Sequence, residues 1–135
     1  MGTLVVGYDG TDGSRAALRA AVSLGGELGD GVVVVFAYHV GRLGGEVSDY
    51  ATALREHAHG VLEEARSVAG DAIEVVELEE YPAQALIAVA EERDARMIVV
   101  GSHGEAPLKS VLVGSTPTKL LHLSERPVLV VRGPD

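Results

Sequence analysis

Five short runs rich in Val, Ile and Leu are spaced along the chain, and each has the length of a β-strand. They cover residues 3–9, 31–39, 72–78, 96–101 and 127–132. Four of them are continuous apolar stretches, which is typical of parallel strands covered by helices on both faces. The third run partly alternates between apolar and acidic residues, which predicts an edge strand with one wetter face.

Between these runs, apolar residues recur at spacings of three and four, the period of an amphipathic helix. The pattern predicts helices over residues 14–28 and about 49–69, and a third helix that opens at Pro82. A last helix is predicted with Thr116 as its N-cap and Pro117 as its first residue. Proline suits such a position because its missing N–H would have no partner there.

Strict alternation of strand and helix predicts a single-domain α/β fold over residues 1–135. We expect an open five-stranded parallel sheet in the order 3-2-1-4-5, with helices on both faces. In this order the first and fourth strands are neighbours whose following helices lie on opposite faces. Their C-terminal loops diverge and leave a crevice where ligands bind. The functional residues are therefore expected to follow Asp9 and Gly101.

Composition and charge exclude several classes of binding partner and site for this chain. The chain carries 11 Lys and Arg against 20 Asp and Glu, a net charge of −9, and it has no Cys. Such a surface repels nucleic-acid phosphates and anionic membranes. Without cysteine there is no disulfide, thiolate nucleophile or cysteine-ligated zinc. The longest apolar run, 32–38, is far short of the ~20 residues that span a bilayer, and no targeting signal is present. We therefore expect a cytoplasmic protein that binds neither nucleic acid nor membrane.

The loops at the predicted crevice contain the residues of an anion site. Gly101-Ser102-His103-Gly104 is followed, after nine residues, by Gly114-Ser115-Thr116 at the start of the last helix. Glycines can adopt positive φ and let backbone approach a ligand, and a helix N-terminus with adjacent hydroxyls binds phosphate. Across the crevice, Asp9 can accept hydrogen bonds from ribose hydroxyls or hold a divalent cation. The base would then lie toward His39-Val40.

Plainer interpretations of these residues are possible. The glycines can simply shape a loop and the hydroxyls can simply cap a helix, but the whole spaced set at the crevice favours a ligand. A Walker A loop fails because Leu108 stands where its second glycine is required. A phospho-acceptor receiver domain would need an acidic pair, a further aspartate and a lysine. The chain offers Asp9 with Asp12, then Glu79-Glu80 and Arg132.

The spacing Gly101-x-x-Gly104-(nine residues)-Gly114-Ser115 matches the nucleotide-binding pattern of the universal stress protein family. The segments around it resemble that family too, including Val6-Gly7-Tyr8-Asp9-Gly10 and the final run at 127–132. The resemblance extends over essentially the whole chain. It implies a domain of the adenine nucleotide α-hydrolase-like group, ATP in the crevice with Mg²⁺ as a candidate companion, and a homodimer formed through the last strand.

Carried over by position, the resemblance implies that Asp9 contacts the ribose and Val40 the adenine. It also implies a set of residues around the phosphates: Gly101, His103, Gly104, Gly114, Ser115 and Thr116. Two positions depart from the family pattern. Glu105 follows the glycine pair, where relatives often carry a basic or neutral residue, and Pro117 removes one amide from the last helix.

The favoured function is an ATP-binding regulatory protein of the stress response, with slow or no hydrolysis. The sequence shows a cradle for a nucleotide but no convincing set of nucleophile, base and orienting group, so no catalytic residue and no dedicated metal ligand is predicted. Two alternatives stay open. One is a weak ATPase or phosphotransferase in which His103 or Asp9 positions water or a metal. The other is an interaction module that has lost its nucleotide, as Glu105 and Pro117 suggest.

Overall fold

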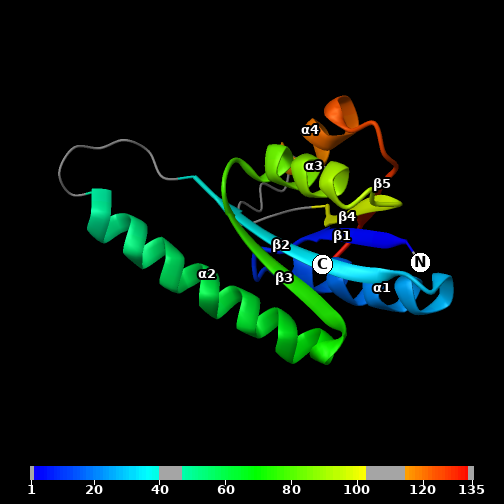
Figure 1. Cartoon of the computed structure of the whole chain (residues 1–135), viewed down its shortest axis with the longest axis horizontal. Coiled ribbons are helices and arrows are strands. Elements are labelled where there is room, and N and C mark those ends of the chain that lie inside the picture. Colours follow the sequence, from blue (N-terminus) through cyan, green and yellow to red (C-terminus); the bar gives the residue numbers. More distant parts are fainter. Residues whose placement is uncertain (1, 40–46, 103–114, 134–135) are drawn as a thin grey trace.

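The fold is taken from a computed structural model that describes residues 2–39, 47–102 and 115–133. Within these ranges, five parallel strands form one sheet in the order β3-β2-β1-β4-β5 (Figure 1). The predicted single-domain α/β fold and its strand order are confirmed. The strands are β1 (Thr3–Gly7), β2 (Gly31–Tyr38), β3 (Ile73–Glu79), β4 (Met97–Gly101) and β5 (Val128–Val131).

Helices cover both faces of the sheet. The first pair, α1 (Asp12–Leu28) and α2 (Val47–Ala69), lies on one face, and α3 (Pro82–Glu92) and α4 (Ser115–Leu123) lie on the other (Figure 1). A short 3-10 helix, η2 (Gly70–Ala72), joins α2 to β3.

The predicted start of α4 is wrong, because the helix begins at Ser115 and already contains Thr116. Thr116 is therefore not the N-cap, and Pro117 is the third residue of the helix. Proline is tolerated there because N–H groups in the first turn have no partner inside the helix. Pro82, in contrast, is the first residue of α3 as predicted.

The central strands explain the continuous apolar runs. Successive residues point to opposite faces, and both faces are buried. On one face, Val6, Val34 and Val99 are fully buried against α1 and α2. On the other, Val5 and its register partner Ile98 in β4 are fully buried against α3 and α4. Each such side chain contributes roughly 1.5–3 kcal/mol relative to exposure.

The two outer strands differ in chemistry. β3 carries Glu74, Glu77 and Glu79, and most of its residues are half-buried or exposed. The predicted edge position is thus confirmed, but the acidic side chains are divided between both faces of the strand, because Glu74 and Glu77 are three residues apart. β5 is entirely apolar, and its Leu129 is 38% exposed. In the described segments, none of the helices is both long and apolar enough to cross a bilayer.

Asp30 connects the N-terminal ends of the central strands, at the end of the sheet opposite the predicted crevice. It follows α1, and its carboxylate accepts hydrogen bonds from the Gly2 amide at 2.9 Å and from Arg96 Nε at 2.5 Å. Its side chain is almost fully covered, whereas that of Arg96 is half exposed. The hydrogen bond from Arg96 is the main cause that lowers the pKa of Asp30. One carboxylate therefore joins the strand β1 to the segment that leads into β4.

Candidate functional site

A pocket opens at the C-terminal ends of β1 and β4, where the strand order predicts a crevice. It is closed on its sides by the end of β2 and by the first turns of three helices. The described residues that line it are Gly7, Tyr8, Asp9, Ser14, Val35, Phe36, Ala37, Pro82, Leu86, Val100, Gly101, Ser115, Thr116 and Pro117. Four predicted site residues, Asp9, Gly101, Ser115 and Thr116, are thus brought together. Val40, His103, Gly104 and Gly114 lie outside the described residues, as does Glu105.

The start of α4 forms part of the pocket lining. Ser115 and Thr116 are its first two residues, so their N–H groups have no acceptor within the helix. These amides lie at the positive end of the helix dipole, with two hydroxyl groups beside them. Pro117 contributes no N–H and is buried. This part of the lining therefore offers hydrogen-bond donors and positive potential, the combination that phosphate requires.

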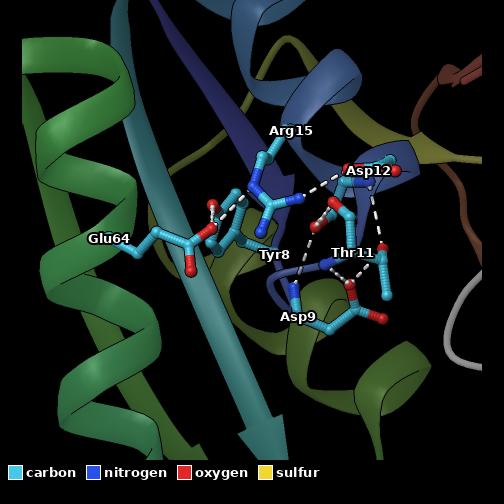
Figure 2. A network of polar contacts seen from close by, with 7 residues as sticks. Tyr8, Asp9, Thr11, Asp12, Arg15 and Glu64 are labelled. Atoms are coloured by element: carbon cyan, nitrogen blue, oxygen red, sulfur yellow. Dashed lines mark hydrogen bonds and ion pairs between the residues drawn. The ribbon is translucent and has the colours of Figure 1, made fainter. Parts of the chain in front are cut away.

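Asp9 also lines the pocket, in the turn that follows β1. Gly10 has a φ of 83°, a left-handed conformation that turns the chain toward α1. The Oδ1 atom of Asp9 accepts hydrogen bonds from the Thr11 hydroxyl at 2.5 Å and from the Thr11 amide at 3.1 Å. Figure 2 shows the second carboxylate oxygen pointing away from these bonds. One oxygen of Asp9 thus builds the turn, and the other can accept from a ligand.

The same turn is continuous with the first turn of α1. Thr11 is the N-cap, and its side chain accepts from the Ser14 amide at 3.3 Å. The buried Ser14 hydroxyl donates to the Thr11 carbonyl at 2.9 Å. This cap starts α1 at Asp12, two residues before the predicted start. A threonine just ahead of an apolar helical stripe is a capping signal that could have located it.

A polar network connects this turn to α2 (Figure 2). Glu64 of α2 accepts hydrogen bonds at Oε1 from the Tyr8 hydroxyl at 2.9 Å and from Arg15 Nε at 2.7 Å. Arg15 also donates from Nη1 to Asp12 at 2.6 Å. The pKa of Tyr8 is raised to about 12, mainly by burial and secondly by its hydrogen bond to the Glu64 carboxylate. Hydrogen bonds from Arg15 and Tyr8 lower the pKa of Glu64.

Gly101 is a glycine for a different reason than predicted. We expected a positive φ and close approach to a ligand, but Gly101 does not adopt positive φ. A Cβ at this position would come within 2.7 Å of the carbonyl carbon and oxygen of Gly13 in α1. The missing side chain is thus needed for backbone packing of β4 against α1. Gly101 still lines the pocket.

Two of the described histidines stack on or contact aromatic rings. His39, just after β2, stacks on Tyr81, the N-cap residue of α3, with ring centroids 4.2 Å apart and planes inclined by 20°. Farther along, the exposed His57 of α2 lies edge-on to Phe36 at 5.8 Å. In the ranges that the structure covers, no group of three or more His, Cys, Asp or Glu side chains is placed to hold a metal.

The chain is similar to known sequences along nearly its whole length. A model of the universal stress protein family matches residues 1–132. The universal stress protein YxiE of Bacillus subtilis is 32% identical over 96% of this chain and 97% of its own. Universal stress protein MJ0531 of Methanocaldococcus jannaschii is 27% identical over 97% of this chain and 82% of its own.

Solved structures show the same fold. The hypothetical protein MJ0577 has a TM-score of 0.87 at 20% identity, with 99% of this chain and 97% of that chain covered. A universal stress protein from Archaeoglobus fulgidus in complex with dAMP has a TM-score of 0.73 at 24% identity, covering 97% and 98%. A universal stress protein in complex with cAMP has a TM-score of 0.72 at 24% identity, covering 98% of both chains.

Proposed function

Because this chain belongs to the universal stress protein family, we propose that it is a regulatory stress-response protein that binds ATP, with slow or no hydrolysis. The observation that carries the proposal is the set of residues that line the pocket. The lining combines the N-terminus of α4, with Ser115 and Thr116, and the carboxylate of Asp9. Such a lining suits a ligand with a phosphate at one end and hydroxyl groups nearer the middle.

Structural relatives bound to dAMP and cAMP support an adenine nucleotide as the ligand class. The described pocket has an apolar wall that suits a purine base, formed by Ala37 of β2 and by Pro82 and Leu86 of α3. In our proposal the ribose lies near the second carboxylate oxygen of Asp9. Val40 contacts the adenine, and the phosphates lie among Gly101, His103, Gly104, Gly114, Ser115 and Thr116.

The donors present also suit Mg²⁺ bound together with the nucleotide. Magnesium is usually held by one or two carboxylates plus phosphate oxygens and water, rather than by a cage of protein ligands. Asp9 supplies one carboxylate in the pocket lining. The ion would neutralise phosphate charge that a strongly acidic chain otherwise repels.

In our proposal turnover is slow, which agrees with the ionisable groups in the described part of the pocket lining, Tyr8 and Asp9. The Tyr8 hydroxyl donates to Glu64, and its pKa of about 12 keeps it protonated at neutral pH. One of the two carboxylate oxygens of Asp9 already accepts hydrogen bonds from Thr11. Neither group is arranged as a general base with an orienting partner, which rapid hydrolysis requires.

The direct test is to find and measure the nucleotide. Purified protein is heat-denatured and its supernatant is analysed by HPLC, and the nucleotide-free protein is titrated with Mg-ATP by calorimetry. We expect released or bound ATP, and weaker binding in Asp9→Ala but not in Glu63→Ala, which removes an exposed carboxylate of α2. No nucleotide and no binding heat at millimolar ATP would contradict the proposal.

We also propose that the chain forms a homodimer through β5 in the cytoplasm, as the sequence suggests. The strand is apolar from Val128 to Val131 and lies at the outer edge of the sheet. Unpaired apolar strand edges tend to be covered by another chain. Two copies of one edge can pair around a twofold axis.

A further inference from the structure

One oxygen atom of Glu64 holds both sides of the turn that carries Asp9. The residue before Asp9 is Tyr8, whose hydroxyl donates to Glu64 Oε1 at 2.9 Å. The residue that begins the second turn of α1 is Arg15, whose Nε donates to the same Oε1 at 2.7 Å. The Arg15 amide donates to the Thr11 carbonyl at 2.9 Å, and the guanidinium also donates to Asp12 at 2.6 Å, so Arg15 is joined to the capped turn by backbone and side chain. Figure 2 shows Glu64 reaching these groups from α2.

The turn itself has a weak intrinsic preference for this conformation. Gly10 adopts positive φ, and glycine loses more backbone freedom on ordering than any other residue. Local hydrogen bonds from Thr11 to Asp9 hold the turn from within. They do not fix its position relative to the pocket, which depends on how Tyr8 and α1 are anchored.

We propose that Glu64 is a positioning residue for the nucleotide: from α2, it clamps Tyr8 and Arg15 so that the Asp9 carboxylate is held ready for the ribose hydroxyls. The inference rests on the proposed function, because it assumes that a nucleotide binds beside Asp9. It adds that α2, which contributes no residue to the described lining of the pocket, controls affinity there.

Removing the clamp lets the turn sample other positions, and apparent affinity falls in proportion to the fraction of molecules that keep the binding geometry. If that fraction drops to between a third and a tenth, the Kd rises about three- to tenfold. The loss should be larger for a nucleotide that carries ribose hydroxyls than for one that lacks them, because only the first uses the ribose contact of Asp9.

The experiment compares Glu64→Met with Glu74→Met. Methionine keeps the length of the side chain and removes the acceptor. Glu74 is a matched control because it also pairs with an arginine, Arg93, whose Nη1 donates to it at 2.8 Å, and it lies outside the described pocket. Tyr8→Phe is a milder second variant that removes one hydroxyl, with Tyr38→Phe as its control, since Tyr38 donates to Glu77 at 2.8 Å.

Each protein is titrated with Mg-ATP and with Mg-2′,3′-dideoxy-ATP. The titrations are made at urea concentrations well below the unfolding midpoint of that protein, so that each variant is folded. We expect Glu64→Met and Tyr8→Phe to weaken the binding of Mg-ATP about three- to tenfold, and the binding of the dideoxy nucleotide clearly less. Equal losses for both nucleotides, a loss equal to that of the controls, or no loss would overturn the clamp. Absence of ATP binding to the unmodified chain would instead reject the proposed function.

Discussion

The backbone of Gly101 in β4 lies directly against Gly13 in the first turn of α1. A Cβ at position 101 would come within 2.7 Å of both the carbonyl carbon and oxygen of Gly13. Gly133, beyond β5, approaches the same helix turn, and a Cβ there would lie 2.9 Å from the Gly13 Cα. Because neither neighbour has a side chain, the N-terminus of α1 can sit close to the ends of β4 and β5, beside the pocket.

Gly101→Ala should destabilise the protein by about 1–3 kcal/mol, the usual cost of forcing an extra carbon into a close-packed site. The clashing atoms are backbone, so no side chain can rotate to make room. Urea unfolding would show a lower midpoint with an unchanged slope. ATP affinity should fall as well, since Gly13 is two residues from Thr11. A variant as stable as the original chain would contradict the close approach.

Gly26→Ala and Gly60→Ala should each stabilise the protein by about 0.5–1 kcal/mol, because alanine reduces the entropy lost when a helix forms. Both positions lie inside helices, and an added Cβ meets nothing within 4 Å. Thermal unfolding would show higher midpoints. Gly29→Ala is the control with the opposite sign, since Gly29 ends α1 with a φ of 72°.

Asp30→Asn should flatten the acid limb of the stability curve. The pKa of Asp30 is lowered in the folded state, chiefly by the hydrogen bond from Arg96. A lowered pKa stabilises the fold above the unfolded value, about 3.9, and this contribution is lost as pH falls through the folded pKa. The stability difference between the two proteins, measured by urea unfolding, should be largest near neutral pH and shrink below about pH 4. A difference independent of pH would argue against an ionised pair.

Leu129→Asp should convert the proposed dimer to monomer. Leu129 is 38% exposed on the outer strand, and burying an unpaired carboxylate in an apolar interface costs about 3 kcal/mol, or roughly a hundredfold in dissociation constant. Sedimentation velocity at micromolar concentration would show the change. Leu28→Asp is a control of similar exposure at the far end of α1. If the original chain sediments as a monomer, the proposed homodimer is wrong.

Local sequence pattern was sufficient for the fold because the central strands are continuous apolar runs, whereas the outer strand β3 carries acidic residues. The continuous run that holds Val32 to Val35 predicts a central strand, and the alternation around Glu74 and Glu77 predicts an edge. The start of α4 was harder to locate. Gly114, Ser115 and Thr116 are all residues that can cap a helix, so propensity does not distinguish them.

The location of the site followed from strand order, but its internal structure did not. Asp9 and Thr116 come together because β1 and α4 meet at one end of the sheet. The clamp was missed because Glu64 is 56 positions from Tyr8 and 49 from Arg15, and no periodic signal connects them. The role of Gly101 was misread for a related reason. Its close neighbour is Gly13, and sequence does not reveal contacts between distant backbones.

The difference in charge between the edge strands β3 and β5 determines which edge of the sheet can pair with a second copy of the chain. Carboxylates along β3 repel a second acidic chain, whereas β5 carries no charge. In the proposed dimer through β5, both edges that remain would be β3 strands with their carboxylates. These would oppose the addition of a third copy, so the proposed assembly would be finite and would not extend into fibrils.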